Sequence, residues 1–121
     1  AAVWSSPPFD PLRRHVELYV AAAFGLGARP DIGAELAPML AGAGAEVDTV
    51  DVVQPVLRRP ADLQIHARTM EAIAEPVISQ GLATAAEVGE LVDALEVWAQ
   101  EPGVVATLPR IVQVHARVPV S

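Results

Sequence analysis

Residues 47–57 read VDTVDVVQPVL, and residues 111–118, near the other end of the chain, read IVQVHARV. Both stretches are rich in valine, a β-branched residue that favours extended strands. The first is apolar enough to predict a strand with both faces covered. The second alternates apolar residues with glutamine, histidine and arginine, which predicts a strand with one apolar and one polar face.

Apolar residues at helical spacing occupy the rest of the chain. We expect helices at about residues 11–24, 31–42 and 61–79, and a fourth from Thr84 to the Pro102-Gly103 pair, with Asp10, Asp31 and Thr84 as caps and Glu87 completing a capping box. Pro76 should kink or end the third helix. Residues 104–108 form either a short antiparallel strand or an extended lead-in.

The length of 121 residues fits a single domain. Residues 1–10 contain Ser5-Ser6-Pro7-Pro8 and lack the periodicity of helix or strand, so we expect a loop there and one domain at residues 11–121. The predicted fold is an α/β segment, or α+β when taken in isolation. It has about four helices and two to three antiparallel strands.

Composition excludes several classes of function. The formal net charge is −7 and the chain has no cysteine, so clustered cations for nucleic acid or anionic membranes and cysteine-based chemistry are both excluded. No apolar run approaches the roughly 18 residues of a membrane span, and no secretory signal is recognisable. We therefore expect a cytoplasmic protein.

Three phrases carry a resemblance to a known family: RRHVELYVAAAFGLGARPDIGAELAPMLAGAGAEVDTVDVV, ISQGLATAAEVGELVDALEVWAQEPG and RIVQVHARV. Their order resembles the carboxy-terminal half of class I S-adenosylmethionine-dependent methyltransferases, particularly small-molecule enzymes of high-GC bacteria. The resemblance implies the sixth strand of a Rossmann-like sheet in the first phrase. It implies helices over the substrate in the second, and a seventh strand, antiparallel to its neighbours, in the third.

The family's cofactor signature is missing from this chain. That signature is a glycine-rich loop after the first strand and an acidic residue at the end of the second, and neither strand is present. Gly25-Leu26-Gly27 and Gly42-Ala43-Gly44 each follow a predicted helix, so they are helix stops and not nucleotide loops. The resemblance therefore implies an acceptor-binding portion that uses S-adenosylmethionine held outside this chain and is inactive alone.

The catalytic candidates are His15 and His66, since a histidine can take the proton that a hydroxyl or amine acceptor loses on methylation. His66 shares an apolar stripe with Met70, and His15 follows an arginine pair that could meet an acidic or phenolic acceptor. The alternatives are a packed structural histidine for His66 and a solvated polar face for His15.

The candidate substrate-binding residues lie mainly near the same end of the chain. They are Trp4, Phe9, Arg14, Tyr19 and Met70. The aromatic members could line a pocket for a planar substrate, although aromatics at such positions are more often core. The three histidines lack metal-ligand spacing, and no serine lies in a strand-turn-helix elbow, so we expect neither a metal site nor a serine nucleophile.

A sheet cut beside its natural neighbour leaves unpaired backbone groups along one edge. We expect that edge to be covered by the missing amino-terminal half or by a second copy of the chain. The rival hypothesis is a non-catalytic α+β module for dimerisation or for binding a small apolar ligand.

Overall fold

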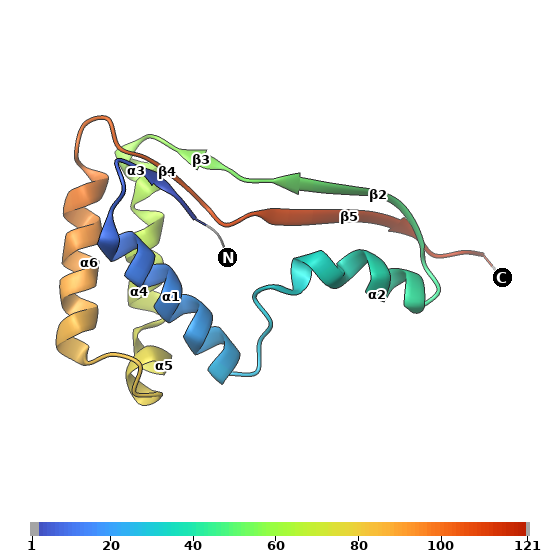
Figure 1. Cartoon of the computed structure of the whole chain (residues 1–121), viewed down its shortest axis with the longest axis horizontal. Coiled ribbons are helices and arrows are strands. Elements are labelled where there is room, and N and C mark those ends of the chain that lie inside the picture. The colour runs from blue at the N-terminus through green and yellow to red at the C-terminus, as the bar shows by residue number, and fades with distance from the viewer. Residues whose placement is uncertain (1–2, 121) are drawn as a thin grey trace.

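A computed structural model describes residues 3–120 as a helical body and an elongated arm (Figure 1). In chain order the elements are β1 (Ser5–Ser6), α1 (Asp10–Gly25), the 3-10 helix η1 (Ile32–Glu35), α2 (Leu36–Gly42), β2 (Glu46–Val53), β3 (Val56–Leu57), α3 (Pro60–Leu63), α4 (Ile65–Ala72), α5 (Ala74–Ser79), α6 (Ala85–Ala99), β4 (Val105–Thr107) and β5 (Ile111–Arg117). Every strand pairing is antiparallel, which confirms the predicted α+β segment. Within these residues no helix has the length and apolar character to cross a membrane.

The body is held together by the apolar stripe of α6. Leu95 and Trp98 project from this helix into a core that also receives Leu18 of α1, Met70 of α4 and Val77 of α5. Each fully buried aliphatic side chain of this kind stabilises the fold by about 1.5–3 kcal/mol.

Thr84 caps α6 as predicted, because its hydroxyl accepts a hydrogen bond from the Glu87 N–H at 3.1 Å.

A long two-stranded ribbon connects the body to the arm. The strands β3 and β4 pair within the body, in a sheet of order β1-β4-β3, and β2 and β5 continue the ribbon into the arm. Pro55 and Pro109 lie in the gap, where proline cannot donate to the ladder. The Leu108 N–H donates to the Pro55 carbonyl at 3.0 Å and bridges the gap. The strand predicted at residues 47–57 is therefore two strands, and the short antiparallel strand at residues 104–108 exists as β4.

The helix predicted at residues 61–79 is divided into α3, α4 and α5. The second break falls at Ile73, three residues before Pro76, and Pro76 itself lies inside α5. A proline ring clashes with the carbonyl four residues earlier, here that of Ala72, so the chain must leave the helix just before α5 begins. Pro76 lies in the first turn of α5, where a backbone N–H would have no partner within the helix, so the N–H that proline lacks costs no hydrogen bond there.

The start of the chain also differs from the prediction. Ser5 and Ser6 form β1, so a loop throughout residues 1–10 is wrong at these positions; residues 1 and 2 lie outside the described residues. A two-residue strand has no periodicity of its own and depends on its pairing with β4. Asp10 lies in the first turn of α1 and not at its cap, which is Phe9.

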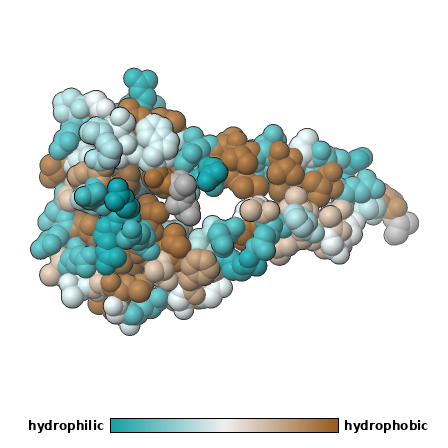
Figure 2. Space-filling view, viewed as in Figure 1, coloured by the Kyte–Doolittle hydropathy of each residue, from teal (hydrophilic) through white to brown (hydrophobic). Residues whose placement is uncertain are grey.

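The arm is far less buried than the body. The 3-10 helix η1 and α2 cover one face of β2 and β5, and Gly33 lets η1 approach because a Cβ there would lie 2.9 Å from a Val112 methyl. None of the residues of η1, α2 or β2 is fully buried, and Val50 and Val52 are more than half exposed. The prediction that both faces of this strand are covered is wrong for the described chain, and apolar side chains remain visible along the arm (Figure 2).

Candidate functional site

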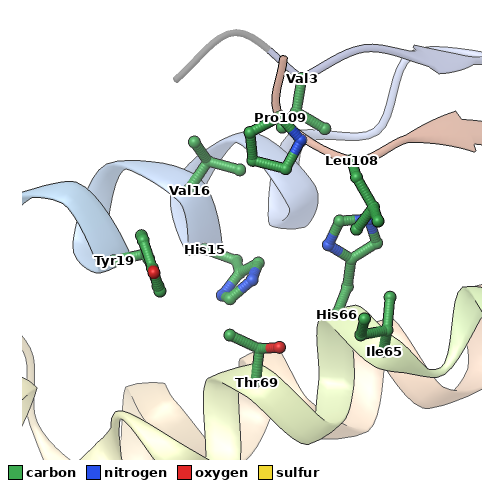
Figure 3. Close-up of a pocket in the computed structure, with 9 residues that line it drawn as sticks. All are labelled: Val3, His15, Val16, Tyr19, Ile65, His66, Thr69, Leu108 and Pro109. Carbon is green, nitrogen blue, oxygen red and sulfur yellow. The ribbon is translucent and has the colours of Figure 1, made fainter. Parts of the chain in front are cut away.

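A cavity of about 180 Å³ lies in the body between α1, α4 and the segment that follows β4 (Figure 3). Its walls are mainly apolar, and its polar atoms come from two histidines, a tyrosine and a threonine. The lining residues are Val3, His15, Val16, Tyr19, Ile65, His66, Thr69, Leu108 and Pro109.

His15 enters the cavity from α1 and is only 3% exposed. Its Nδ1 lies 3.2 Å from the Met70 sulfur. A thioether sulfur has no proton to donate and can only accept, so this contact favours the tautomer that carries its proton on Nδ1. The Nε2 atom of His15 is then an acceptor.

His66 enters from α4 and is 4% exposed. Its Nε2 lies 3.2 Å from the carbonyl oxygen of Thr107, the last residue of β4. A carbonyl only accepts, so the proton of this imidazole is on Nε2 and Nδ1 is the acceptor. The contact also fixes the orientation of the ring relative to the sheet.

The two imidazole rings approach each other edge to face, with centroids 5.8 Å apart. Burial, and secondarily the positive charge that His66 can carry, lower the pKa of His15 to about 4. Burial also lowers the pKa of His66, although its hydrogen bond to the Thr107 carbonyl acts in the opposite direction. Both histidines are therefore neutral at pH 7.

Of the residues singled out in the sequence, the structure brings three to the cavity and places Met70 directly behind it. His15, His66 and Tyr19 line the cavity, and Met70 is fully buried against His15. The two histidines are 51 positions apart (66 − 15), and the packing of α1 against α4 brings them together.

Three predicted substrate-binding residues lie elsewhere. Phe9 stacks on Trp98 at 5.2 Å between centroids and packs against the core, while Trp4 is half exposed beside β4. Arg14 points to the other side of α1, where its Nε donates to Glu87 at 2.9 Å. That hydrogen bond raises the pKa of the guanidinium, so Arg14 is a structural ion-pair partner and not a cavity residue.

The sequence reasoning missed the other lining residues. Val16 follows His15, with Tyr19 a turn further on, and Ile65 precedes His66, with Thr69 a turn further on. Residues four apart share one face of a helix, as His15 and Tyr19 do on α1 and Ile65 and Thr69 do on α4. This spacing is the sequence signal for the two helix faces that line the cavity. Leu108 and Pro109 had no such signal, because only the position of β4 brings them to the cavity.

The third histidine is remote from this site. His115 lies on the polar face of β5, where its Nδ1 is 3.7 Å from an Asp48 carboxylate oxygen. Within residues 3–120, no group of three or more histidine, aspartate or glutamate side chains is arranged to hold a metal ion. The chain matches no protein-family model, and no curated protein or solved structure is found to be similar to it.

Proposed function

We propose that this chain is the acceptor-binding portion of an S-adenosylmethionine-dependent methyltransferase that acts on a small molecule in the cytoplasm. The observation that carries the proposal is the pair of buried, neutral histidines that share one apolar cavity. When an O–H or N–H acceptor is methylated it loses a proton, and an uncharged imidazole held beside it can accept that proton. The apolar walls would exclude water from the acceptor.

The cavity does not fit the methyl donor itself. A volume of about 180 Å³ is close to the roughly 150 Å³ of a cavity that holds one benzene molecule, so a nucleoside with an amino-acid side arm is too large. Among the described residues, the glycine pairs near α1 and α2 follow helices. We therefore assign the donor to a separate layer, and we derive no step of the reaction through it.

The arm supports the existence of that layer. Within residues 3–120, β5 pairs with β2 on one side only, so its other edge has no strand partner. A two-stranded ribbon is marginal by itself in water, and exposed edges are normally covered. In our proposal a cofactor-binding half, in the same polypeptide or in another, extends the sheet along β5. The antiparallel pairing of β2 and β5 is what the resemblance predicts for its last two strands.

A second candidate is a non-catalytic module that binds a small apolar ligand and dimerises through the arm. It is favoured by the fact that the described chain brings both histidines and the apolar lining residues together. In that case the edge of β5 would pair with a second copy, and the two histidines would serve only to orient the ligand.

Calorimetric titration with S-adenosylmethionine separates the two candidates. The 121-residue chain and a polypeptide extended by the residues encoded upstream would each be titrated, with light scattering to record their mass. Our proposal predicts no binding to the 121-residue chain and micromolar or tighter binding to the extended one. A stable dimer of the shorter chain, together with an extended chain that does not bind the cofactor, would contradict it and favour the module.

A further inference from the structure

The histidine cavity selects its occupant by size. Its volume of about 180 Å³ slightly exceeds the roughly 150 Å³ that accommodates benzene in an apolar protein cavity. Valine, isoleucine, leucine and proline side chains supply most of the wall, and the Tyr19 ring closes one side (Figure 3). The space therefore has about the volume of one six-membered ring.

The polar atoms of the cavity select by hydrogen-bond direction. The N–H of His15 donates to the Met70 sulfur, and the N–H of His66 donates to the Thr107 carbonyl oxygen. Each imidazole therefore has only a lone pair left to offer, on Nε2 of His15 and on Nδ1 of His66. An occupant that donates a hydrogen bond can pair with one of these acceptors, whereas one that only accepts can pair with neither.

The lining of the cavity disfavours charged ligands. The lining contains no arginine, lysine, aspartate or glutamate. Arg14, which lies next to His15 in sequence, is held by Glu87 and by the Leu82 carbonyl on the other side of α1. An anion would find no cation in the cavity and a cation no carboxylate, so either would bear the full cost of leaving water.

We infer that this cavity binds a single neutral aromatic ring bearing a hydroxyl group, a simple phenol, whose O–H donates to a ring nitrogen of His15 or His66. The inference rests on the proposed function in one respect: it names the class of acceptor that the enzyme would methylate. It also narrows the sequence expectation of an acidic or phenolic acceptor to the phenolic one.

A matched ligand series tests the inference on the 121-residue chain. Phenol, anisole and benzoate would be titrated at pH 7.5, with binding measured by calorimetry and located by the ¹⁵N shifts of the histidine rings. Phenol has a hydroxyl hydrogen-bond donor that anisole lacks, and benzoate carries a negative charge. We expect phenol to bind about tenfold more tightly than anisole and at least tenfold more tightly than benzoate, with shifts at His15 and His66 only.

The inference is overturned if anisole binds as tightly as phenol, if benzoate binds best, or if none of the three perturbs either buried histidine. Substitutions of the histidines add a second readout. His15→Leu and His66→Leu each remove one acceptor and keep the wall apolar, and at least one of them should reduce the preference for phenol over anisole to below about threefold. His115→Leu removes the exposed histidine of β5 and should leave the preference unchanged. If neither variant of the buried histidines folds, the ligand series on the unmodified chain still decides.

Failure of this inference and failure of the proposed function give different results. Phenol selectivity in a protein whose extended form does not bind S-adenosylmethionine would support the cavity assignment and contradict the methyltransferase. An extended form that binds the cofactor and methylates an aliphatic amine, but not phenol, would contradict the cavity assignment alone.

Discussion

The body and the arm both contain many aliphatic residues, yet they bury them very differently. In the body, Leu95, Met70 and Val77 are completely buried in the core formed by α1, α4, α5 and α6. In the arm, the valines of β2 are partly or largely exposed on a ribbon covered on one face by a short helix. The body therefore has the interior of an independent domain, whereas the arm has the composition of a buried sheet with only one face covered.

The largest effect that distinguishes the two regions is expected at Leu95. Leu95→Ala removes a fully buried side chain between α6 and α4 and should lower the free energy of unfolding by about 2–5 kcal/mol. Val97, two residues further along α6, is 65% exposed, so Val97→Ala should change the free energy of unfolding by less than about 0.5 kcal/mol. Urea denaturation measures both, and equal effects would contradict the assignment of the core.

Acid should destabilise the body through its histidines. The pKa of His15 is about 4 in the folded protein and near 6.5 in the unfolded chain, so only the unfolded chain binds a proton between these values. Stability should be unaffected above pH 6.5 and fall by up to about 3 kcal/mol as the pH drops to 4. His66 acts in the same direction, because burial lowers its pKa as well. Denaturation at a series of pH values should show a smaller loss in His15→Leu, and an identical loss would contradict this origin.

A smaller effect is expected at the cap of α6. Thr84→Ala removes the hydroxyl that accepts from the Glu87 N–H and should cost about 1 kcal/mol in thermal or urea unfolding. Thr84→Ser retains an acceptor oxygen and is the matched control. If the serine and alanine variants are equally destabilised, the hydrogen bond is not the cause.

The smallest effect is expected in the arm. Val52→Ala on β2 removes methyl groups from a side chain that is 58% exposed, so the free energy of unfolding should change by less than about 0.5 kcal/mol. Once a partner layer covers the ribbon, the same substitution should weaken the complex. A loss above 2 kcal/mol in the isolated chain would mean that the arm already has a core.

Much of the fold follows from local patterns in the sequence. The stripe of α6, its cap and the alternation of β5 all depend on residues within a few positions of one another, and all three are present in the structure. The strand β1 could not be predicted in this way, because Ser5 and Ser6 are extended only through pairing with β4. The break at Ile73 follows from Pro76, because the proline ring clashes with the carbonyl of Ala72, four residues earlier.

Only part of the candidate site could be predicted from the sequence: His15, Tyr19 and His66 line the cavity, whereas the other lining residues were not named. His66 was recognisable on an apolar helical stripe, and His15 lay beside two arginines that suggested a polar surface. Their proximity depends on the packing of α1 against α4, and the outward turn of Arg14 depends on Glu87, which is 73 positions away. Long-range contacts of this kind leave no local periodicity to detect.

Native-state hydrogen exchange tests most directly whether the arm is a surface prepared for a partner. The account predicts that amides of α4 and α6 exchange only through global unfolding, whereas those of β2 and β5 exchange with an opening free energy at least about 2 kcal/mol smaller. Equal protection in the arm and in α6, measured on the monomeric 121-residue chain, would contradict it, because the ribbon would then be stable without a partner.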